Sequence, residues 1–507
     1  MPPTIRDNTE RTRETMTDLK IRSEDLKAGT ETTQITGHYE VGEKIAYHKA
    51  EVRLVRKLDI FIAPVMMLLM LISYLDRGNI GYAATQGMVE DINLQGSELN
   101  IAVSLFYVFY VLAEFPISLF AKRLQFNRVI PAAAFGWGLV CLCNGFVQNF
   151  GGLVACRLVL GLLEGLLFPS MTLLLANWFK REELATRVSY LFIASALAGA
   201  FGGLIAFAIL YMDGAAGYAG WRWLYIIEGA ITIFIAFCCI FLIPENYERA
   251  YFLNEEDKKI MRQRAEEMES YSGGKGHYNM KDVRTAVSDV KTWVHGGMQI
   301  CAVTILYGFG TFLPIILKNS FHFSTKQAQY LVIPVNLWGA AIYWVGAIIS
   351  DKYNARFLVM IIAAPIGIAG YAILLAWKVS PGALYFATFL IATPCYLCAG
   401  TNIAWLSGNC APDGKRAASL GVQLTLTNIG GIISGQIYQN KSAPQFVLGN
   451  AWSLASLGVV WVGCWALRYI YLKREGWKRG MRERFANGQY EIPDLWRSTD
   501  REPEYKY

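Results

Sequence analysis

The chain has 507 residues, of which 54% are hydrophobic and only 17% are charged. Soluble domains carry about 25% charged residues, so this composition excludes an ordinary soluble protein and predicts an integral membrane protein. The net charge of +7 does not indicate nucleic-acid binding, because Lys and Arg gather at the ends of apolar segments. The ten cysteines lie in or beside the same segments, which indicates buried thiols rather than a disulfide framework.

Apolar stretches near the ~20 residues needed to cross a membrane recur along the chain. Twelve such spans are expected, at 58–85, 99–121, 129–148, 151–176, 187–211, 221–243, 293–317, 327–350, 356–377, 382–407, 416–439 and 450–472. They predict an all-α membrane protein with twelve transmembrane helices in two six-helix bundles. The expected divisions are a disordered cytoplasmic tail at 1–56, bundles at 57–243 and 293–472, a cytoplasmic linker at 244–292 and a tail at 473–507.

Basic residues are unevenly distributed between the two sets of connections. One set includes Arg53, Arg56, Lys57, Lys122, Arg123, Arg128, Lys180, Arg181, Arg187, Lys352, Arg356, Lys415, Arg416 and Lys473. The other set holds only Lys318, Lys326, Lys378 and Lys441. Positive charge favours the cytoplasmic side, so both termini are expected in the cytoplasm. We expect the chain to lie in the plasma membrane.

Charged residues occur inside four of these spans, and two of the four carry the main candidates for chemistry. Asp76 and Arg77 lie in the first, and Arg157 and Glu164 lie in the fourth. A charge at membrane depth costs roughly 2.5–3.5 kcal/mol, so such groups face a bundle interior or a wet cavity. Arg157 and Glu164 are seven residues apart and share one helix face. This pattern is typical of a proton-coupled carrier for a small anion.

Each of these four residues has a predicted role. Glu164 and Asp76 are the candidates for carrying protons, because a buried carboxyl group changes its proton affinity with its surroundings. Arg77 is the candidate for binding a substrate carboxylate through its planar fork. Arg157 is expected to hold the acids in place, although the two arginines could exchange roles. Side chains of adjacent residues diverge by about 100° on a helix, so Asp76 and Arg77 are not expected to bond each other.

Other polar residues receive weaker predictions. Glu114 is interpreted as structural, and Glu228 as a partner of Arg222. The five histidines fall in tails, loops or span edges, which excludes a histidine relay. The second half offers neutral polar residues, among which Asn428 is the candidate for touching substrate.

Several motifs carry a resemblance to a known family. The loop Gly346-Ala-Ile-Ile-Ser-Asp351-Lys352-Tyr-Asn-Ala-Arg356 resembles the cytoplasmic gate loop of the major facilitator superfamily, with Asn354 in place of a glycine. Tyr74-Leu-Asp76-Arg77, Arg157 with Glu164, and Trp221-Arg222-Trp223 resemble the anion:cation symporter family of that superfamily. The fungal branch that it resembles contains permeases for allantoate, nicotinate and pantothenate.

The resemblance implies roles for named residues. It implies proton coupling at Asp76 and Glu164, a substrate arginine at Arg77 and a supporting charge at Arg157. It also implies that Tyr74, Tyr110 and Asn428 line the substrate site. The gate loop of Asp351, Lys352 and Arg356 would join the two halves at the cytoplasmic side.

The predicted function is import of a small organic anion by proton symport with alternating access, in a protein that acts as a monomer in the lipid bilayer. The cargo would be a monocarboxylate such as nicotinate or pantothenate, or an allantoate-like anion. An exporter or proton antiporter remains an alternative, as does a non-transporting nutrient sensor on the same scaffold. An enzyme is disfavoured, because the sequence has no metal-ligand cluster, nucleophile–base motif or phosphate loop, and no cofactor is expected.

Overall fold

The computed structural model describes residues 49–120, 125–271, 280–376, 378–410, 413–439 and 442–487, and these residues form helices and connections without strands. The first half contains the long helices α2 (Ala63–Thr85), α4 (Glu98–Phe120), α5 (Phe126–Asn144), α6 (Phe150–Glu164), α7 (Leu167–Trp178), α8 (Arg181–Ile209) and α9 (Gly220–Leu242). The second half contains α12 (Val290–Asn319), α13 (Thr325–Tyr353), α14 (Arg356–Ala376), α15 (Pro381–Gly408), α16 (Asp413–Ile437) and α17 (Val447–Ala486).

Most of these helices are built to cross a membrane. Within the described residues, ten helices are long and apolar enough to do so. The helices α4 and α16 complete two sets of six, with α6 and α7 counted as one interrupted span. The predicted fold class of twelve transmembrane helices in an all-α membrane protein is therefore confirmed.

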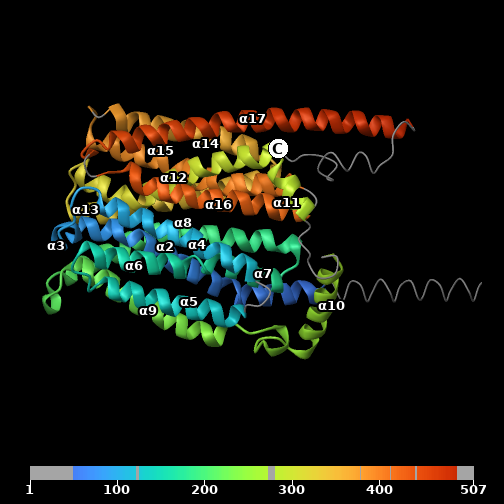
Figure 1. The fold of residues 1–507 in the computed structure, drawn as a ribbon, viewed down its shortest axis with the longest axis horizontal. Coiled ribbons are helices and arrows are strands. Elements are labelled where there is room, and N and C mark those ends of the chain that lie inside the picture. Colours follow the sequence, from blue (N-terminus) through green and yellow to red (C-terminus); the bar gives the residue numbers. More distant parts are fainter. Residues whose placement is uncertain are drawn as a thin grey trace, which may run out of the picture.

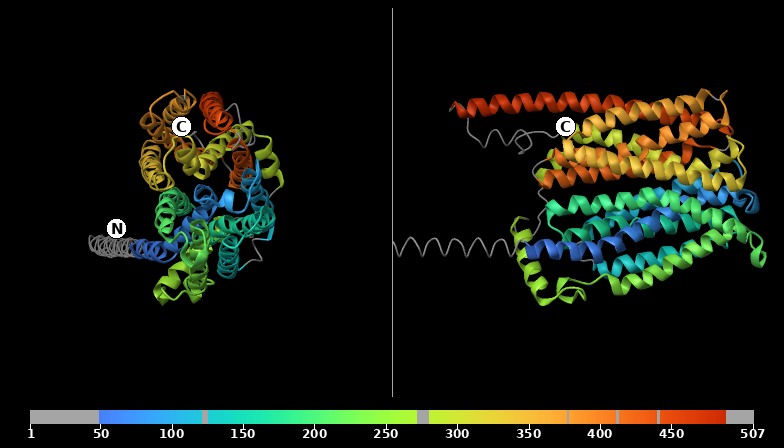
Figure 2. Two further views of the ribbon diagram at one scale, coloured as in Figure 1. Left: turned by 90° about the vertical axis from the view of Figure 1, so that its left-hand side faces the viewer. Right: turned by 180° about the vertical axis from the view of Figure 1, so that it is seen from behind.

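The long helices run roughly parallel to one axis, with the first half below and the second half above in Figure 1. Figure 2 shows the two halves end-on and from behind, and the helices of each half group together. The halves meet where α2 packs on α12, α4 on α16 and α8 on α13. The described chain begins and ends at the end of the molecule where α10 (Glu255–Tyr271) and α11 (Met280–Val287) lie, which we call the linker end. We call the other end the far end.

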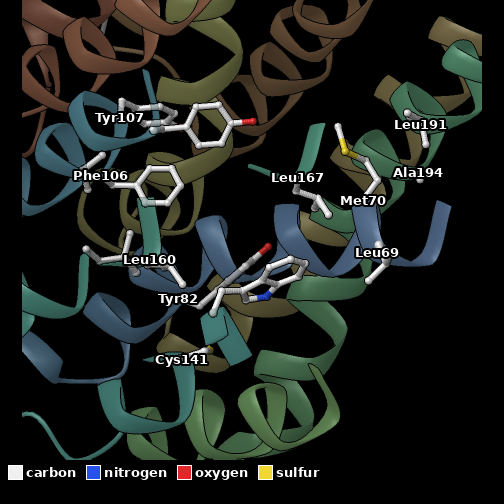
Figure 3. Packing of buried hydrophobic residues seen from close by; sticks show 14 of the residues in the cluster. Leu69, Met70, Tyr82, Phe106, Tyr107, Cys141, Leu160, Leu167, Leu191 and Ala194 are labelled. Carbon is white, nitrogen blue, oxygen red and sulfur yellow. The ribbon is translucent and has the colours of Figure 1, made fainter. Parts of the chain in front are cut away.

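An apolar core runs through both halves. Figure 3 shows part of it, including Leu69, Leu160 and Leu191 from three different helices. Many large apolar side chains, such as Phe234 and Trp344, are instead exposed on the outside of the bundle. Exposed apolar side chains of this size suit a surface that faces lipid rather than water.

The fourth span differs from its prediction, because it is interrupted rather than continuous. Helix α6 ends at Glu164 and α7 begins at Leu167. Pro169 explains the interruption, since it lacks an N–H and its ring clashes with the carbonyl four residues earlier, at Gly165. The interruption places Glu164 at the end of a helix in the middle of the span.

The last span also differs, because α17 continues well past residue 472 to Ala486. Arg474 on this extension donates from Nη2 to Oδ1 of Asp289 at 2.8 Å. The ion pair fixes the extension to the start of α12, so this part of the expected tail is an ordered helix. In the expected linker, α10 is a helix rich in charged residues.

Candidate functional site

Arg77 and Glu164 form an ion pair inside the first half. Arg77 Nε donates to Glu164 Oε2 at 2.8 Å. Ser73, one turn before Arg77 on α2, donates from Oγ to the same oxygen at 2.8 Å. Glu164 is fully buried, and its Oε1 has no hydrogen-bond partner among the described residues. The pair therefore leaves one carboxylate oxygen with unused hydrogen-bonding capacity.

Two glycines bring the helix of Glu164 against α4. A Cβ on Gly161 would lie 2.2 Å from the carbonyl oxygen of Phe106, and one on Gly165 would lie 2.5 Å from that of Tyr110. Only a residue without a side chain allows such an approach of the two backbones. Glu164 lies between these glycines and is thereby held beside α2 and α4.

Aromatic rings surround the Arg77 guanidinium. Its central carbon lies 4.7 Å from the ring centre of Tyr74 and 4.7 Å from that of Tyr110. The ring of Tyr107 stacks on Tyr307 of the second half, with centroids 5.0 Å apart. A guanidinium over aromatic faces is stabilised by cation–π attraction and keeps its charge in an apolar surrounding.

Asp76 lies in a second polar cluster rather than beside Arg77. Trp137 Nε1 donates to Asp76 Oδ2 at 3.0 Å, and the Cys141 thiol donates to Oδ1 at 3.2 Å. Asn79 Nδ2 lies 3.4 Å from Asp76 Oδ1 and 2.5 Å from Glu228 Oε2. Asp76 and Arg77 therefore have different partners, as the helix geometry predicts.

Arg157 and Glu228 form their hydrogen bonds with other residues than the sequence predicts. Arg157 is buried and donates from Nη2 to the Tyr225 hydroxyl at 3.0 Å, whereas Arg77 and Ser73 donate to Glu164. Arg222 pairs with Asp91 at 2.9 Å, and Glu228 contacts Asn79 instead of Arg222. Spacing on one helix indicates a shared face, but neighbouring helices decide which groups meet.

A central cavity lies between the two halves, next to this ion pair. It has two lobes of about 60 Å³ each, which share Tyr74, Ser195, Leu306, Tyr307 and Tyr396. The Arg77 lobe is lined by Arg77, Tyr107 and Asn336 among others. The Glu114 lobe is lined by Tyr110, Glu114, Gln299 and Asn428 among others. Tyr74 thus lines both lobes, Arg77 lines one, and Tyr110 and Asn428 line the other, whereas Asp76 and Glu164 line neither.

Sequence reasoning missed two features of this cavity. Glu114 was interpreted as structural, but it lines the cavity and accepts from Asn428 Nδ2 at 2.6 Å. Its spacing of four residues from Tyr110 could have indicated the shared face. Tyr307 had no signal in the sequence, because its position depends on how the second half packs against the first.

His295 was expected at a span edge but is fully buried inside the second half. Its Nδ1 lies 2.6 Å from Asn402 Oδ1 and its Nε2 lies 2.9 Å from the Tyr471 hydroxyl. Asn402 in turn donates to Gln299 Oε1 at 2.7 Å, and Gln299 lines the cavity. The network ties α12 to α15 and α17, and Gln299 connects it to the Glu114 lobe.

The structure describes only part of the predicted gate loop. Asn354 ends α13 with φ of 49°, a left-handed conformation that Asn tolerates better than most residues. It can therefore replace the glycine expected there. Arg356 Nη1 donates to the Ala404 carbonyl at 2.8 Å, and the Lys352 ammonium lies 5.5 Å from the Tyr353 ring centre. The Asp351 side chain and residues Lys122 and Arg123 lie outside what the structure describes.

The two halves are bonded together at the far end. Lys318 Nζ donates to the Thr85 carbonyl at 2.6 Å, and Gln329 Nε2 donates to the Thr85 hydroxyl at 2.6 Å. Between α4 and α16, Asn100 Nδ2 donates to the Tyr438 carbonyl at 2.9 Å. We call these contacts, which tie α2 to α12 and α13 and tie α4 to α16, the far-end seal.

Two packed helical halves around a central cavity, with an arginine in its wall, are the architecture of a membrane carrier. The sequence profile of the Major Facilitator Superfamily matches residues 66–435, and the chain belongs to that superfamily. An uncharacterized transporter of Schizosaccharomyces pombe is 40% identical over 447 residues, covering 87% of this chain and 88% of the relative. The protein is therefore a transporter of the major facilitator type.

Two further similarities bear on function and fold. The high-affinity nicotinic acid transporter of Saccharomyces cerevisiae is 32% identical over 463 residues, covering 91% of this chain and 85% of that protein. The inward open structure of the xylose transporter XylE from E. coli superposes with a TM-score of 0.61 at 16% identity, over 79% of this chain and 95% of XylE. The structural similarity concerns the fold alone.

Proposed function

We propose that the protein imports a small organic monocarboxylate together with a proton. The observation that carries this proposal is the Arg77–Glu164 ion pair, in which Arg77 lines the central cavity and Glu164 lies behind it. A guanidinium at a cavity wall suits a carboxylate substrate. The similarity to a nicotinic acid transporter supports a vitamin-like anion such as nicotinate, with pantothenate and allantoate-like anions in the same class.

The geometry suggests how proton and substrate are coupled. While Glu164 is ionised, it occupies Arg77 through the 2.8 Å bond and competes with a substrate carboxylate. A proton on Glu164 removes that competition, so Arg77 can bind the anion. The charge of the site is the same before and after, because one negative group replaces another. Proton and anion thus favour each other's binding, a reciprocal coupling typically of about 1–3 kcal/mol.

The distribution of charge supports an orientation of the chain in the membrane. Basic side chains gather at the linker end, because Arg264 lies on α10 and both Lys415 and Arg474 pair with Asp289, two residues after the end of α11. Positively charged connections favour the cytoplasm, so we assign the linker end to the cytoplasmic side and the far end to the exterior of the plasma membrane. Alternating access would open the seal at Thr85 to admit cargo and close it to release cargo inward.

Transport by purified protein in liposomes tests this proposal. Uptake of radiolabelled nicotinate, pantothenate and allantoate is measured with and without an inward proton gradient. We expect at least one anion to accumulate only with the gradient, and Arg77→Gln to abolish that uptake. Arg262→Gln is the matched control, because Arg262 pairs with Glu248 on the exposed linker. No uptake of any of the three, or equal uptake without a gradient, would contradict the proposal.

A further inference from the structure

The two lobes of the central cavity meet at a region that we call the waist. Among the described residues, the waist consists of those that line both lobes, namely Tyr74, Ser195, Leu306, Tyr307 and Tyr396. The Arg77 guanidinium lies next to the waist, because its central carbon is 4.7 Å from the Tyr74 ring centre. A carboxylate bound at Arg77 therefore leaves the rest of a small cargo at the waist, among aromatic side chains.

The ring of Tyr307, on α12, has one face covered by the first half. Tyr107 on α4 stacks on it, with ring centroids 5.0 Å apart and an angle of 25° between the ring planes. The Tyr74 ring is 6.5 Å away and tilted by 48°, so it does not cover the other face in the same manner. Since Tyr307 lines both lobes, the face opposite Tyr107 is available to a group at the waist.

The ring of Tyr396, on α15, is supported in a similar way by α13. A Cβ on Gly339 would lie 3.0 Å from Cδ2 and 3.1 Å from Cε2 of this ring, so the ring packs directly on the glycine backbone. Its hydroxyl donates to Asn336 Oδ1 at 3.3 Å, and these two contacts with α13 fix the orientation of the ring. The waist thus has two rings that are held in place before cargo binds, and such preorganisation lowers the cost of binding.

Aromatic rings attract one another in offset-stacked or edge-to-face arrangements, beyond the gain from burying apolar area. We propose that Tyr307 and Tyr396 recognise an aromatic ring on the cargo, whose carboxylate faces Arg77. This inference rests on the proposed function, because it takes the cargo to be a carboxylate bound at Arg77. It narrows the cargo to aromatic monocarboxylates, a class that includes nicotinate and excludes pantothenate and allantoate. Tyr307 and Tyr396 are then specificity-determining residues.

Two other roles for these rings predict different results. If the waist only buries apolar area, as the Leu306 side chain also does, a saturated ring should bind as tightly as an aromatic ring of the same carbon skeleton. If the stack of Tyr307 on Tyr107 only joins the two halves, loss of the Tyr307 ring should weaken the binding of both ligands equally. Only recognition of an aromatic ring makes the preference between the two ligands depend on Tyr307.

Binding of matched ligand pairs to the purified full-length protein separates these roles. One pair is benzoate and cyclohexanecarboxylate, and the other is phenylacetate and cyclohexylacetate, so that the ring is tested at two spacings from the carboxylate. Dissociation constants are measured by isothermal titration calorimetry for the wild type, Tyr307→Leu, Tyr307→Phe and Tyr396→Leu. Tyr385→Leu is the matched control, because Tyr385 is also on α15 but donates to the Leu331 carbonyl at 3.0 Å and lines neither lobe as the structure describes them.

We expect the wild type to bind the aromatic member of at least one pair about tenfold more tightly. Tyr307→Leu and Tyr396→Leu should each reduce that ratio to about threefold, whereas Tyr307→Phe, which keeps the ring, and Tyr385→Leu should preserve it. If one of the two waist leucine variants binds neither member, the ratio in the other decides. Equal binding within both pairs, no binding of either pair, an unchanged ratio in the waist leucine variants, or loss of all binding in both of them would overturn the inference. Gradient-driven uptake of nicotinate, pantothenate or allantoate that persists in that case would leave the proposed function standing.

Discussion

Arg77 on α2 donates to Glu164 on α6 at 2.8 Å, at the point where two glycines bring the end of α6 against α4. The other arginine on the helix of Glu164, Arg157, bonds to Tyr225 instead. The ion pair therefore joins the residue that lines the cavity to the acid behind it.

Removing one member of the ion pair should be worse for stability than removing both. Arg77→Leu leaves the fully buried Glu164 without its cation, which typically costs about 3–5 kcal/mol. The double variant Arg77→Leu/Glu164→Leu removes both charges and should recover most of that loss. Thermal unfolding in detergent measures the stability of the single and the double variants. A double variant that is less stable than either single variant would contradict the burial of Arg77 and Glu164 as an ion pair.

Gly161 should not tolerate even a methyl group. A Cβ there would meet the Phe106 carbonyl oxygen at 2.2 Å, so α6 and α4 would have to separate. Overpacking of this kind costs about 1–3 kcal/mol, and we expect Gly161→Ala to lower the melting temperature and displace Glu164. Gly297→Ala is the control, because a Cβ at Gly297 meets nothing within 4 Å. Equal melting temperatures for the two variants would argue against the close approach.

The far-end seal should weaken without Lys318. Its ammonium bonds to the Thr85 carbonyl at 2.6 Å and so ties α12 to the end of α2. We expect Lys318→Ala to speed hydrogen–deuterium exchange in the last turn of α2 by about tenfold. Lys326→Ala is the matched control, because the Lys326 ammonium lies 5.2 Å from the Tyr211 ring centre rather than on Thr85. Equal exchange in the two variants would show that Lys318 does not hold the seal.

Asp289 should stabilise the linker end in a pH-dependent way. Burial opposes its ionisation, but the hydrogen bond from Arg474 and the charges of Lys291 and Lys415 outweigh burial and hold its pKa well below the ordinary value. A carboxyl group with a lowered pKa stabilises the fold fully above its unfolded pKa of about 3.9, and this stabilisation is lost as pH falls toward the folded pKa. Asp289→Asn should therefore lower the melting temperature at pH 7, with a smaller difference below about pH 4. A difference that does not change with pH would contradict this account.

The sequence predicted the fold and the burial of the charged residues within the spans, because a charge in an apolar span has few physical explanations. It could not predict which groups pair. Glu164 shares a helix face with Arg157, yet it bonds to Arg77 on α2, while Gly161 and Gly165 bring the end of its own helix against α4. Such pairing depends on how closely two backbones approach, and spacing within one helix does not contain that information.

The cavity itself was the least predictable part. Glu114 and Tyr307 come from different halves, and their common position depends on packing between α2, α4, α12 and α16. The sequence puts His295 at the edge of a span but does not predict its burial. That burial depends on contacts with Asn402 and Tyr471 on other helices. Residues of this kind carry no periodic signal of their own.

Transport by Glu164→Gln in liposomes tests the central claim most directly. Glutamine keeps the shape of the side chain but cannot carry the proton. We predict that the variant exchanges internal for external nicotinate, or whichever anion the wild type carries, but no longer accumulates it in response to an inward proton gradient. Undiminished uphill uptake by Glu164→Gln would contradict the claim that this carboxyl group couples the proton to the cargo.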